Sequence, residues 1–147
     1  MIIAISHRLA ASRERVYAAL TDPALLQRCI DGCEKMVRTG EDAYDVELKV
    51  GVAGMKGAYK GKVRLSAQQP PESLTLAVEG KGLPGFVRGT ANLRFAEAEG
   101  STDISGQGDV VVGGLIAAVG SRLIEAAAKK MMADFFARVA AQLTSGS

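Results

Sequence analysis

The side chains of this 147-residue chain that could take part in acid–base or nucleophilic chemistry are few and widely spaced. Its single histidine, His7, lies in an alternating apolar segment, and no serine or cysteine stands in a recognisable nucleophile motif with it. A lone histidine on an apolar strand face is more often a hydrogen-bonded core residue than a catalytic base. We therefore expect no catalytic residue, and we consider His7 a candidate for a single polar contact inside a pocket.

Metal and nucleotide sites are also not expected. Cys29 and Cys33 are four residues apart across Asp31-Gly32, but a zinc site needs about four ligands at a recognisable spacing. We expect two free thiols in a cytoplasmic protein, with no metal. The segments Gly80-Lys81-Gly82 and Gly113-Gly114 match neither a phosphate loop nor a dinucleotide fingerprint, so no nucleotide cofactor is predicted.

The charge pattern argues against nucleic acid as a partner. The 18 basic and 16 acidic residues are well mixed, which leaves a net charge of +2 and no extended positive field. Basic residues gather at Lys56, Lys60, Lys62 and Arg64. We interpret this group as the solvated outer face of a strand rather than as an anion or membrane-surface site.

Length and hydropathy favour one domain, residues 1–147, which is long enough to bury a core without disulfides. No apolar run reaches the roughly 18 residues of a transmembrane helix. The N-terminal segment lacks the pattern of a secretory signal. We expect a cytoplasmic protein that is able to make peripheral contact with the inner face of the membrane.

The elements that position these side chains follow from the hydrophobic periods. Apolar and polar residues alternate from Ile3 to Leu9, and again near residues 34–39, 43–53, 57–69, 73–82, 86–96 and 101–112, as in half-buried antiparallel strands. Ser12 and Asp22-Pro23 are start signals for two short helices, the second of which runs to about Cys29. From Gly113 to Leu143 there is no proline, and helix formers predominate, which predicts one long terminal helix.

This order predicts an α+β fold in which a curved antiparallel sheet wraps around the terminal helix. The two-residue strand period places Gly61, Gly80, Gly89, Gly106 and Gly108 on the inner face. Such glycines either mark bulges and bends of a curved sheet or leave space that a ligand fills, because protein interiors are close-packed. Both interpretations stay open, since the curvature is itself what opens a pocket.

The predicted pocket lies between the sheet and the helix, with Phe86 near its mouth and with Tyr59 or His7 as the polar contact. Apolar burial supplies most of the affinity in such a site. The predicted ligand-binding residues are Val50, Tyr59, Val63, Leu76, Phe86, Gly89, Ala91, Gly108, Val110, Ile116, Val119 and Leu123.

The terminal helix carries two apolar faces in the sequence. One consists of Ile116, Val119, Leu123, Ala127 and Met131, and the other, rotated from it, of Met132, Phe135, Phe136, Val139 and Leu143. One straight contact with the sheet cannot bury both faces. Either the helix bends, or its C-terminal half packs against the short helices, or apolar surface near Phe135, Phe136 and Leu143 stays exposed for a partner.

Several segments of the sequence resemble those of the CoxG family, the G subunits of carbon monoxide dehydrogenases. The resemblance runs over nearly the whole chain. The segments are Asp22-Pro23 with Arg28 to Glu34, Tyr59 to Val63, Gly85-Phe86 with Gly89 to Ala91, Val112 to Gly114, Gly120 to Ile124, and Ala127 to Lys130. The family's turn between the cysteines usually has proline where this chain has Asp31. The resemblance implies the helix-grip fold of the START-like superfamily, also called SRPBCC or polyketide cyclase-like.

For function, the resemblance implies a non-catalytic accessory protein of a carbon monoxide dehydrogenase-type molybdenum hydroxylase. Such a protein binds a hydrophobic molecule such as a quinone or lipid, or assists assembly or membrane recruitment of the enzyme. Longer members have a membrane-associating tail, whereas this sequence ends at Ser147, so we expect no recruitment through such a tail. A cyclase or hydratase that uses His7 or a tyrosine is a third hypothesis, which the scarcity of pocket-facing titratable groups disfavours.

Overall fold

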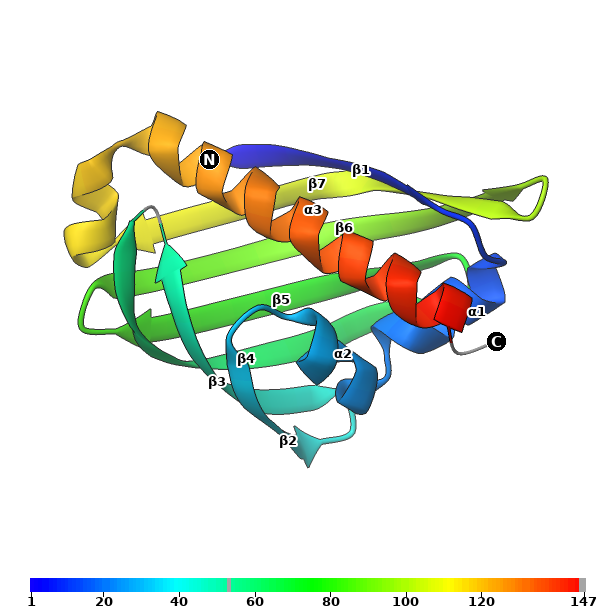
Figure 1. The fold of residues 1–147 in the computed structure, drawn as a ribbon, viewed down its shortest axis with the longest axis horizontal. Helices are drawn as coiled ribbons and strands as arrows, with labels where there is room; N and C mark the ends of the chain where they lie inside the picture. Colours follow the sequence, from blue (N-terminus) through cyan, green and yellow to red (C-terminus); the bar gives the residue numbers. More distant parts are fainter. Residues whose placement is uncertain (53, 146–147) are drawn as a thin grey trace.

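The protein has one large antiparallel sheet and helices on one face of it (Figure 1). The structure is a computed structural model that describes residues 1–52 and 54–145. Its elements, in chain order, are β1 (Ile2–Leu9), α1 (Arg13–Leu20), α2 (Pro23–Cys29), β2 (Cys33–Gly40), β3 (Ala43–Val52), β4 (Met55–Gln69), β5 (Ser73–Gly82), β6 (Gly85–Ala98), β7 (Ser101–Gly113), the 3-10 helix η1 (Gly114–Val119) and α3 (Ser121–Ser145).

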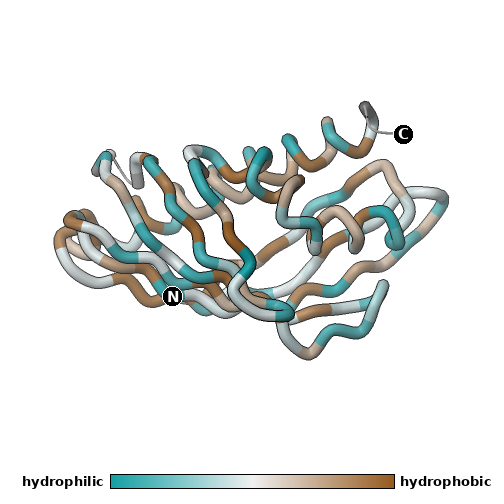
Figure 2. Tube along the Cα trace, turned by 90° about the horizontal axis from the view of Figure 1, so that it is seen from below, coloured by the Kyte–Doolittle hydropathy of each residue, from teal (hydrophilic) through white to brown (hydrophobic). Residues whose placement is uncertain are grey.

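The sheet order is β1-β7-β6-β5-β4-β3-β2, and each pair of neighbours is antiparallel. Strands β2 to β7 therefore form a meander, and β1 pairs with β7 at the far edge. The long helix α3 crosses one face of this sheet (Figure 1). Figure 2 shows it along one side, with hydrophobic and hydrophilic residues alternating along the strands. The predicted α+β fold and the strand ranges are confirmed, except that residue 53 lies outside the described residues.

Both predicted helix starts are confirmed by their caps. The Ser12 hydroxyl accepts a hydrogen bond from the Arg15 amide at 3.3 Å, and Asp22 Oδ1 accepts one from the Ala24 amide at 3.0 Å. Pro23 occupies the first turn of α2, where its missing N–H leaves no intrahelical bond unmade. These short polar contacts set where the chain turns between β1 and β2.

The terminal helix differs from its prediction. Residues Gly114–Val119 form a separate 3-10 helix, and Gly120, with φ 96° and ψ 153°, separates it from α3. Such a backbone conformation is accessible essentially only to glycine. The prediction of one helix from Gly113 was therefore wrong, because the composition favours helix on both sides of a residue whose backbone does not allow it.

The break also resolves the two apolar faces. From Ser121 onwards α3 presents a single stripe of buried or half-buried residues, Ile124, Ala128, Met132, Phe135, Phe136, Val139 and Leu143, at helical spacing. The C-terminal half packs against α1 and α2, where Phe136, Val139 and Leu143 share a core with Val16 and Leu26. Packing against the short helices is thus the correct alternative. The expected exposed surface is wrong for Phe136 and Leu143, which are only 6% and 8% exposed.

Most of the buried apolar residues form two separate clusters. The large core joins α1, α2 and the C-terminal half of α3 to the sheet, and it includes Val16, Phe95, Ile104 and Val139. The small core consists of Tyr59, Ile116 and Ile124, with Leu48, Val50, Val87, Val112 and Val119 packed against them. It lies at the other end of α3, around η1. The middle of the inner face therefore lies between two packed regions.

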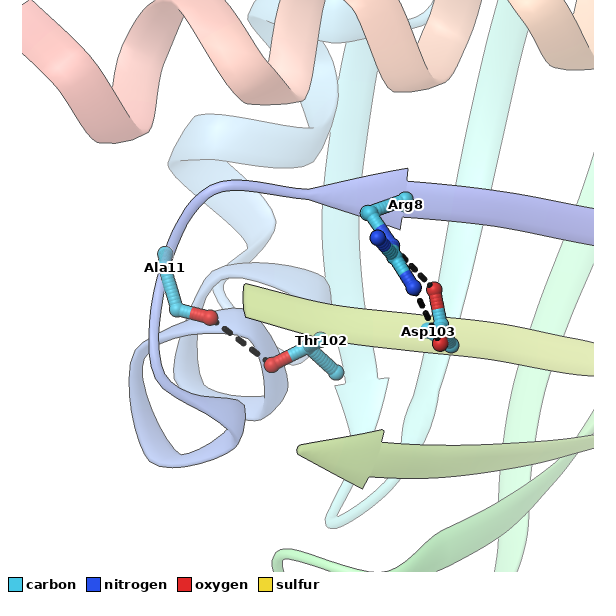
Figure 3. Close-up of polar contacts among 4 residues, drawn as sticks. All are labelled: Arg8, Ala11, Thr102 and Asp103. Atoms are coloured by element: carbon cyan, nitrogen blue, oxygen red, sulfur yellow. Dashed lines mark hydrogen bonds and ion pairs between the residues drawn. The ribbon is translucent and has the colours of Figure 1, made fainter. Parts of the chain in front are cut away.

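Polar contacts hold the end of β1 and the segment that follows it against β7 (Figure 3). Fully buried Thr102 donates a hydrogen bond from its hydroxyl to the Ala11 carbonyl oxygen at 2.8 Å. On the exposed side, Arg8 binds the Asp103 carboxylate through two nitrogens, at 2.7 and 3.1 Å. These contacts hold the segment before α1 against the sheet.

Candidate functional site

A cavity of about 390 Å³ lies between the inner face of the sheet and α3. Its floor consists of two rows of paired residues from β4, β5, β6 and β7. One row is Val63, Val78, Gly89 and Val110, and the next is Leu65, Leu76, Ala91 and Gly108. The size lies within the usual range of small-molecule sites, roughly 300–1,000 Å³.

The floor is only partly covered by side chains. Val78, at the centre of the inner face, is 38% exposed, although such a position in a four-strand row would normally be buried by the helix above it. The neighbouring Gly89 and Ala91 add little volume to the floor. Interiors are otherwise packed to near-crystalline density, so this central region is an unfilled space.

The inward glycines were expected either to allow bends and close approach within the sheet or to leave space for a ligand, and the structure shows both roles. A Cβ at Gly61 or Gly106 would collide with a carbonyl oxygen of the neighbouring strand, so these glycines allow close approach of the backbones. A Cβ at Gly89 or Gly108 would meet its nearest heavy atoms at 3.6 and 3.9 Å, which is ordinary contact. At Gly80 the nearest atom is 4.0 Å away. Gly89 and Gly108 therefore leave space in the cavity, whereas Gly61 and Gly106 serve the geometry of the sheet.

The roof of the cavity comes from the middle of α3. Ala128, Met131, Met132 and Phe135 contribute to it. The residues expected here from the sequence were Ile116, Val119 and Leu123, because the predicted helix continued through Gly120. The helical spacing of the apolar residues from Ala128 to Phe135 is the sequence signal for this roof. It predicts the correct face only if the helix is taken to begin after Gly120.

Six of the predicted ligand-binding residues line the cavity: Val63, Leu76, Gly89, Ala91, Gly108 and Val110. Four others belong to the small core: Val50, Tyr59, Ile116 and Val119. Leu123 is 57% exposed. The structure thus brings the central strand positions together and places the remaining residues beside the cavity or outside it.

Phe86 lies on the outer face of the sheet rather than near the mouth. A Cβ at Gly113, its partner across the β6–β7 ladder, would collide with the Phe86 ring, and the Arg88 guanidinium lies 5.5 Å from the ring centroid. Phe86 and Arg88 are two residues apart on β6, so both face away from α3. The prediction of Phe86 near the mouth was therefore wrong, because the two-residue alternation along β6 places its side chain on the outer face.

The two predicted polar contacts do not line the cavity. The His7 ring stacks on Phe136 with centroids 4.3 Å apart, and burial lowers the His7 pKa. The Tyr59 hydroxyl is buried in the small core without a hydrogen-bond partner among the described residues, and burial raises the Tyr59 pKa. Tyr44 and Asp31 line the cavity instead. Tyr44 faces inward because it pairs with inward Val63 across the β3–β4 ladder.

The cysteine pair shows no sign of activation. Cys29 is buried, Cys33 is half-buried, and both are free thiols. Burial raises the pKa of both thiols, which disfavours the reactive thiolate. Within residues 1–52 and 54–145, no three His, Cys, Asp or Glu side chains gather as metal ligands would.

A larger hollow, of about 800 Å³, lies on the outer face of the sheet. Its rim mixes cations such as Lys60 and Lys62 with the carboxylates of Asp45, Glu47 and Glu79. Mixed charge of this kind is typical of a solvated strand face. The cavity under α3 is therefore the candidate site.

The sequence profile of CoxG, the G subunit of carbon monoxide dehydrogenase, matches residues 6–144. The chain belongs to the CoxG family. None of the curated proteins matches the chain significantly in sequence. Among solved structures, a conserved protein from Geobacillus kaustophilus is 31% identical with a TM-score of 0.95, over 99% of this chain and 96% of that one.

More distant structures share the fold of this CoxG-family chain. A START superfamily protein from Mycobacterium smegmatis is 9% identical with a TM-score of 0.77, and 99% of each chain is covered. A protein from Chromobacterium violaceum is 21% identical with a TM-score of 0.71, over 95% of this chain and 94% of that one. The START-like helix-grip fold is thus confirmed.

None of the helices in the described part of the CoxG-family chain combines the length and the apolar character needed to cross a membrane.

Proposed function

We propose that this CoxG-family protein is a non-catalytic carrier of a hydrophobic small molecule, quinone-like or lipid-like, for a carbon monoxide dehydrogenase-type molybdenum hydroxylase. The observation that carries the proposal is the unfilled space at the centre of the inner face, where Val78 is 38% exposed beneath α3. Membership of the CoxG family is the reason for proposing this class of enzyme as the partner.

The cavity favours an apolar ligand. Its floor is valine, leucine, alanine and glycine, and its roof includes Met131, Met132 and Phe135. Burial of a few hundred Å² of ligand surface at roughly 25 cal/mol per Å² gives several kcal/mol before ordering costs. The methionine side chains adapt to ligands of irregular shape. Tyr44 also lines this space, and its hydroxyl is the group that we expect to orient a carbonyl or hydroxyl oxygen of the ligand.

Binding is better supported than turnover. The ionisable side chains that line the cavity in the described residues are Asp31 and Tyr44. Asp31 forms an ion pair with Arg138 at 3.6 Å on the exposed turn. Acid–base catalysis needs positioned groups whose pKa values suit proton transfer, and the His7 ring, the candidate base in the sequence, is stacked on Phe136.

The carrier proposal is tested by filling the cavity. Gly89→Leu and Gly108→Leu should keep the fold, because a Cβ at either position meets only ordinary contacts, and both should abolish uptake of a ubiquinone analogue. Uptake is measured by fluorescence quenching, with circular dichroism as the check on folding. Gly40→Leu, at the exposed end of β2, is the matched control and should bind normally.

Unchanged uptake in both cavity variants would overturn the carrier proposal. Native mass spectrometry of the freshly purified protein, followed by organic extraction, should also find a bound quinone or lipid and identify its class.

A second candidate is recruitment of the hydroxylase through protein contacts, and one observation favours it. Leu83 in the β5–β6 turn is 99% exposed, and Leu115 in η1 is 63% exposed. The two segments adjoin, because the Ile116 amide donates to the Pro84 carbonyl oxygen at 2.8 Å. Exposed apolar groups that gather on an ordered surface are typical of interaction sites.

A pull-down with a carbon monoxide dehydrogenase-type hydroxylase tests recruitment. The double variant Leu83→Asp with Leu115→Asp should lose capture of the enzyme, and Val37→Asp, at an exposed apolar position on β2, should retain it. Equal capture by the wild type and both variants would exclude this surface.

A further inference from the structure

A polar hollow of about 370 Å³ adjoins the apolar cavity at the turn between α2 and β2. Ile30 and Asp31 line both spaces. The hollow receives Arg28 from α2, Lys49 from β3 and Arg138 from α3. The ligand cavity thus borders a hollow that is lined by three basic residues from three elements.

Hydrogen bonds to two backbone carbonyl oxygens hold the elements around the hollow together. The Lys49 amide donates to the Gly32 carbonyl oxygen at 2.9 Å, which joins the turn to β3. The Arg138 guanidinium donates to the Cys29 carbonyl oxygen at 3.5 Å, which joins α3 to the end of α2. The basic side chains therefore project from an ordered frame.

The charges of the hollow are only weakly engaged with one another. Arg138 lies 3.6 Å from the Asp31 carboxylate, and Lys49 lies 3.8 Å from that of Glu34; all four side chains are exposed. Exposed pairs of this kind contribute little free energy, so a bound anion can displace them. Arg28 has no ion pair within the part of the chain that the structure describes. The three cations exceed the two carboxylates, so the hollow favours an anion.

We infer that the ligand is an amphiphile whose apolar chain fills the cavity and whose anionic headgroup, a carboxylate or phosphate, binds Arg138, Arg28 and Lys49 in the hollow. This inference rests on the proposed carrier function. A charged group is strongly disfavoured inside the apolar cavity, so a chain seated there leaves its headgroup at the Ile30–Asp31 border. Guanidinium groups bind carboxylate and phosphate oxygens through paired donors.

The test compares two ligands that differ only in the headgroup. Calorimetric titrations use myristate and myristyl alcohol, both below their micelle-forming concentrations, in a buffer of low ionic strength that keeps the carboxylate ionised. The wild-type protein should bind myristate about tenfold more tightly than the alcohol. Inorganic phosphate alone should not displace myristate, because it lacks the chain that the cavity holds.

Variants assign the effect to the hollow. Arg138→Gln should weaken myristate binding about tenfold and leave binding of the alcohol unchanged, with Lys49→Gln acting in the same direction. Arg122→Gln, on an exposed residue of α3 outside the hollow, is the matched control. Asp31→Asn removes a competing carboxylate and should strengthen myristate binding, a gain that misfolding cannot produce.

Three results would overturn the inference, and they separate it from the carrier function. If myristate and myristyl alcohol bind with equal affinity, and Arg138→Gln changes neither affinity, the headgroup site is overturned. The carrier function of the cavity would still stand. Displacement of myristate by inorganic phosphate would show an anion site independent of the cavity. Failure of both amphiphiles and of the ubiquinone analogue to bind would overturn the carrier function itself.

Discussion

At the scale of single residues, the cavity depends on which glycines are needed by the backbone and which are not. Gly61 and Gly106 lie where a Cβ would strike the next strand, but Gly89 and Gly108 do not. The same residue type therefore has two physical roles within one sheet. Only the second role leaves volume for a ligand, which is why the two leucine substitutions test the site rather than the fold.

Thr102 is expected to be important for stability. Its buried hydroxyl satisfies the Ala11 carbonyl oxygen at 2.8 Å, and Thr102→Val would leave that acceptor without its donor. We expect the free energy of unfolding to fall by about 1–3 kcal/mol, measured by urea denaturation. Thr75→Val, which loses an exposed bond to Asn92, should cost less, and equal costs for the two variants would contradict the prediction.

His7 should give the protein a pH-dependent component of stability. Burial lowers the pKa of folded His7 below its ordinary value of 6.5, so the unfolded chain takes up the proton first as pH falls. Stability from this group is therefore complete above pH 6.5 and declines as pH falls through the range below it.

The contribution of His7, the only histidine in the chain, is isolated by subtracting the pH profile of a His7 variant from that of the wild type. The free energy of unfolding of His7→Gln, followed against pH, should lack this component, while carboxylate effects at lower pH cancel between the two proteins. Parallel pH profiles for wild type and His7→Gln would show that His7 titrates alike in the folded and unfolded states.

At the scale of elements, the break at Gly120 determines which face of α3 meets the sheet. It separates η1, whose Ile116 belongs to the small core, from a helix whose stripe begins at Ile124. With a continuous helix, Leu123 would take the position expected from the sequence. The break instead leaves Leu123 exposed and turns Ala128 and Met132 toward the cavity.

Gly120→Ala should be destabilising through the backbone alone. A Cβ at Gly120 has no neighbour within 4 Å, but φ is 96°, a conformation that costs a non-glycine residue about 1–3 kcal/mol. Chemical denaturation measures this loss. Gly40→Ala, which has no positive φ and an ordinary contact at 3.7 Å, should change stability little; if both variants behave alike, the break is not held by glycine.

At the scale of the whole molecule, the cavity divides the buried apolar residues into a large and a small core. The small core has three buried residues, Tyr59, Ile116 and Ile124, and the large core joins both short helices to the sheet. An empty space between two clusters weakens their coupling, because residues on its border lose packing partners. A ligand that fills the space would restore contacts to the large-core residues that line it, such as Leu65 and Phe136.

Hydrogen exchange should reveal this division. Amides of η1 and the first turns of α3 are expected to exchange faster than those near Val139, which is fully buried in the large core. Bound myristate should slow exchange in the middle of α3, where Ala128 and Met132 line the cavity, and Gly89→Leu should abolish that effect. Uniform exchange along α3, with or without ligand, would contradict the two-core description.

The sequence alone determined the order and type of nearly every element and the family. Alternation of apolar residues fixed the strands, and Ser12 and Asp22-Pro23 fixed the short helices, because these signals are local. The same period identified the six cavity residues that lie on central strands, such as Gly89 and Val110. Local chemistry was sufficient wherever a residue's neighbours in sequence decide its orientation.

Tertiary structure decided the rest. The rotation of α3 after Gly120, the inclusion of Tyr44 and Asp31 in the cavity wall, and the meeting of Arg28, Lys49 and Arg138 join residues far apart in the chain. Composition favours helix on both sides of Gly120, so it does not reveal the break. Which glycines leave space and which permit close approach depends on the distance to another strand, and that distance is set only when the sheet closes over the helix.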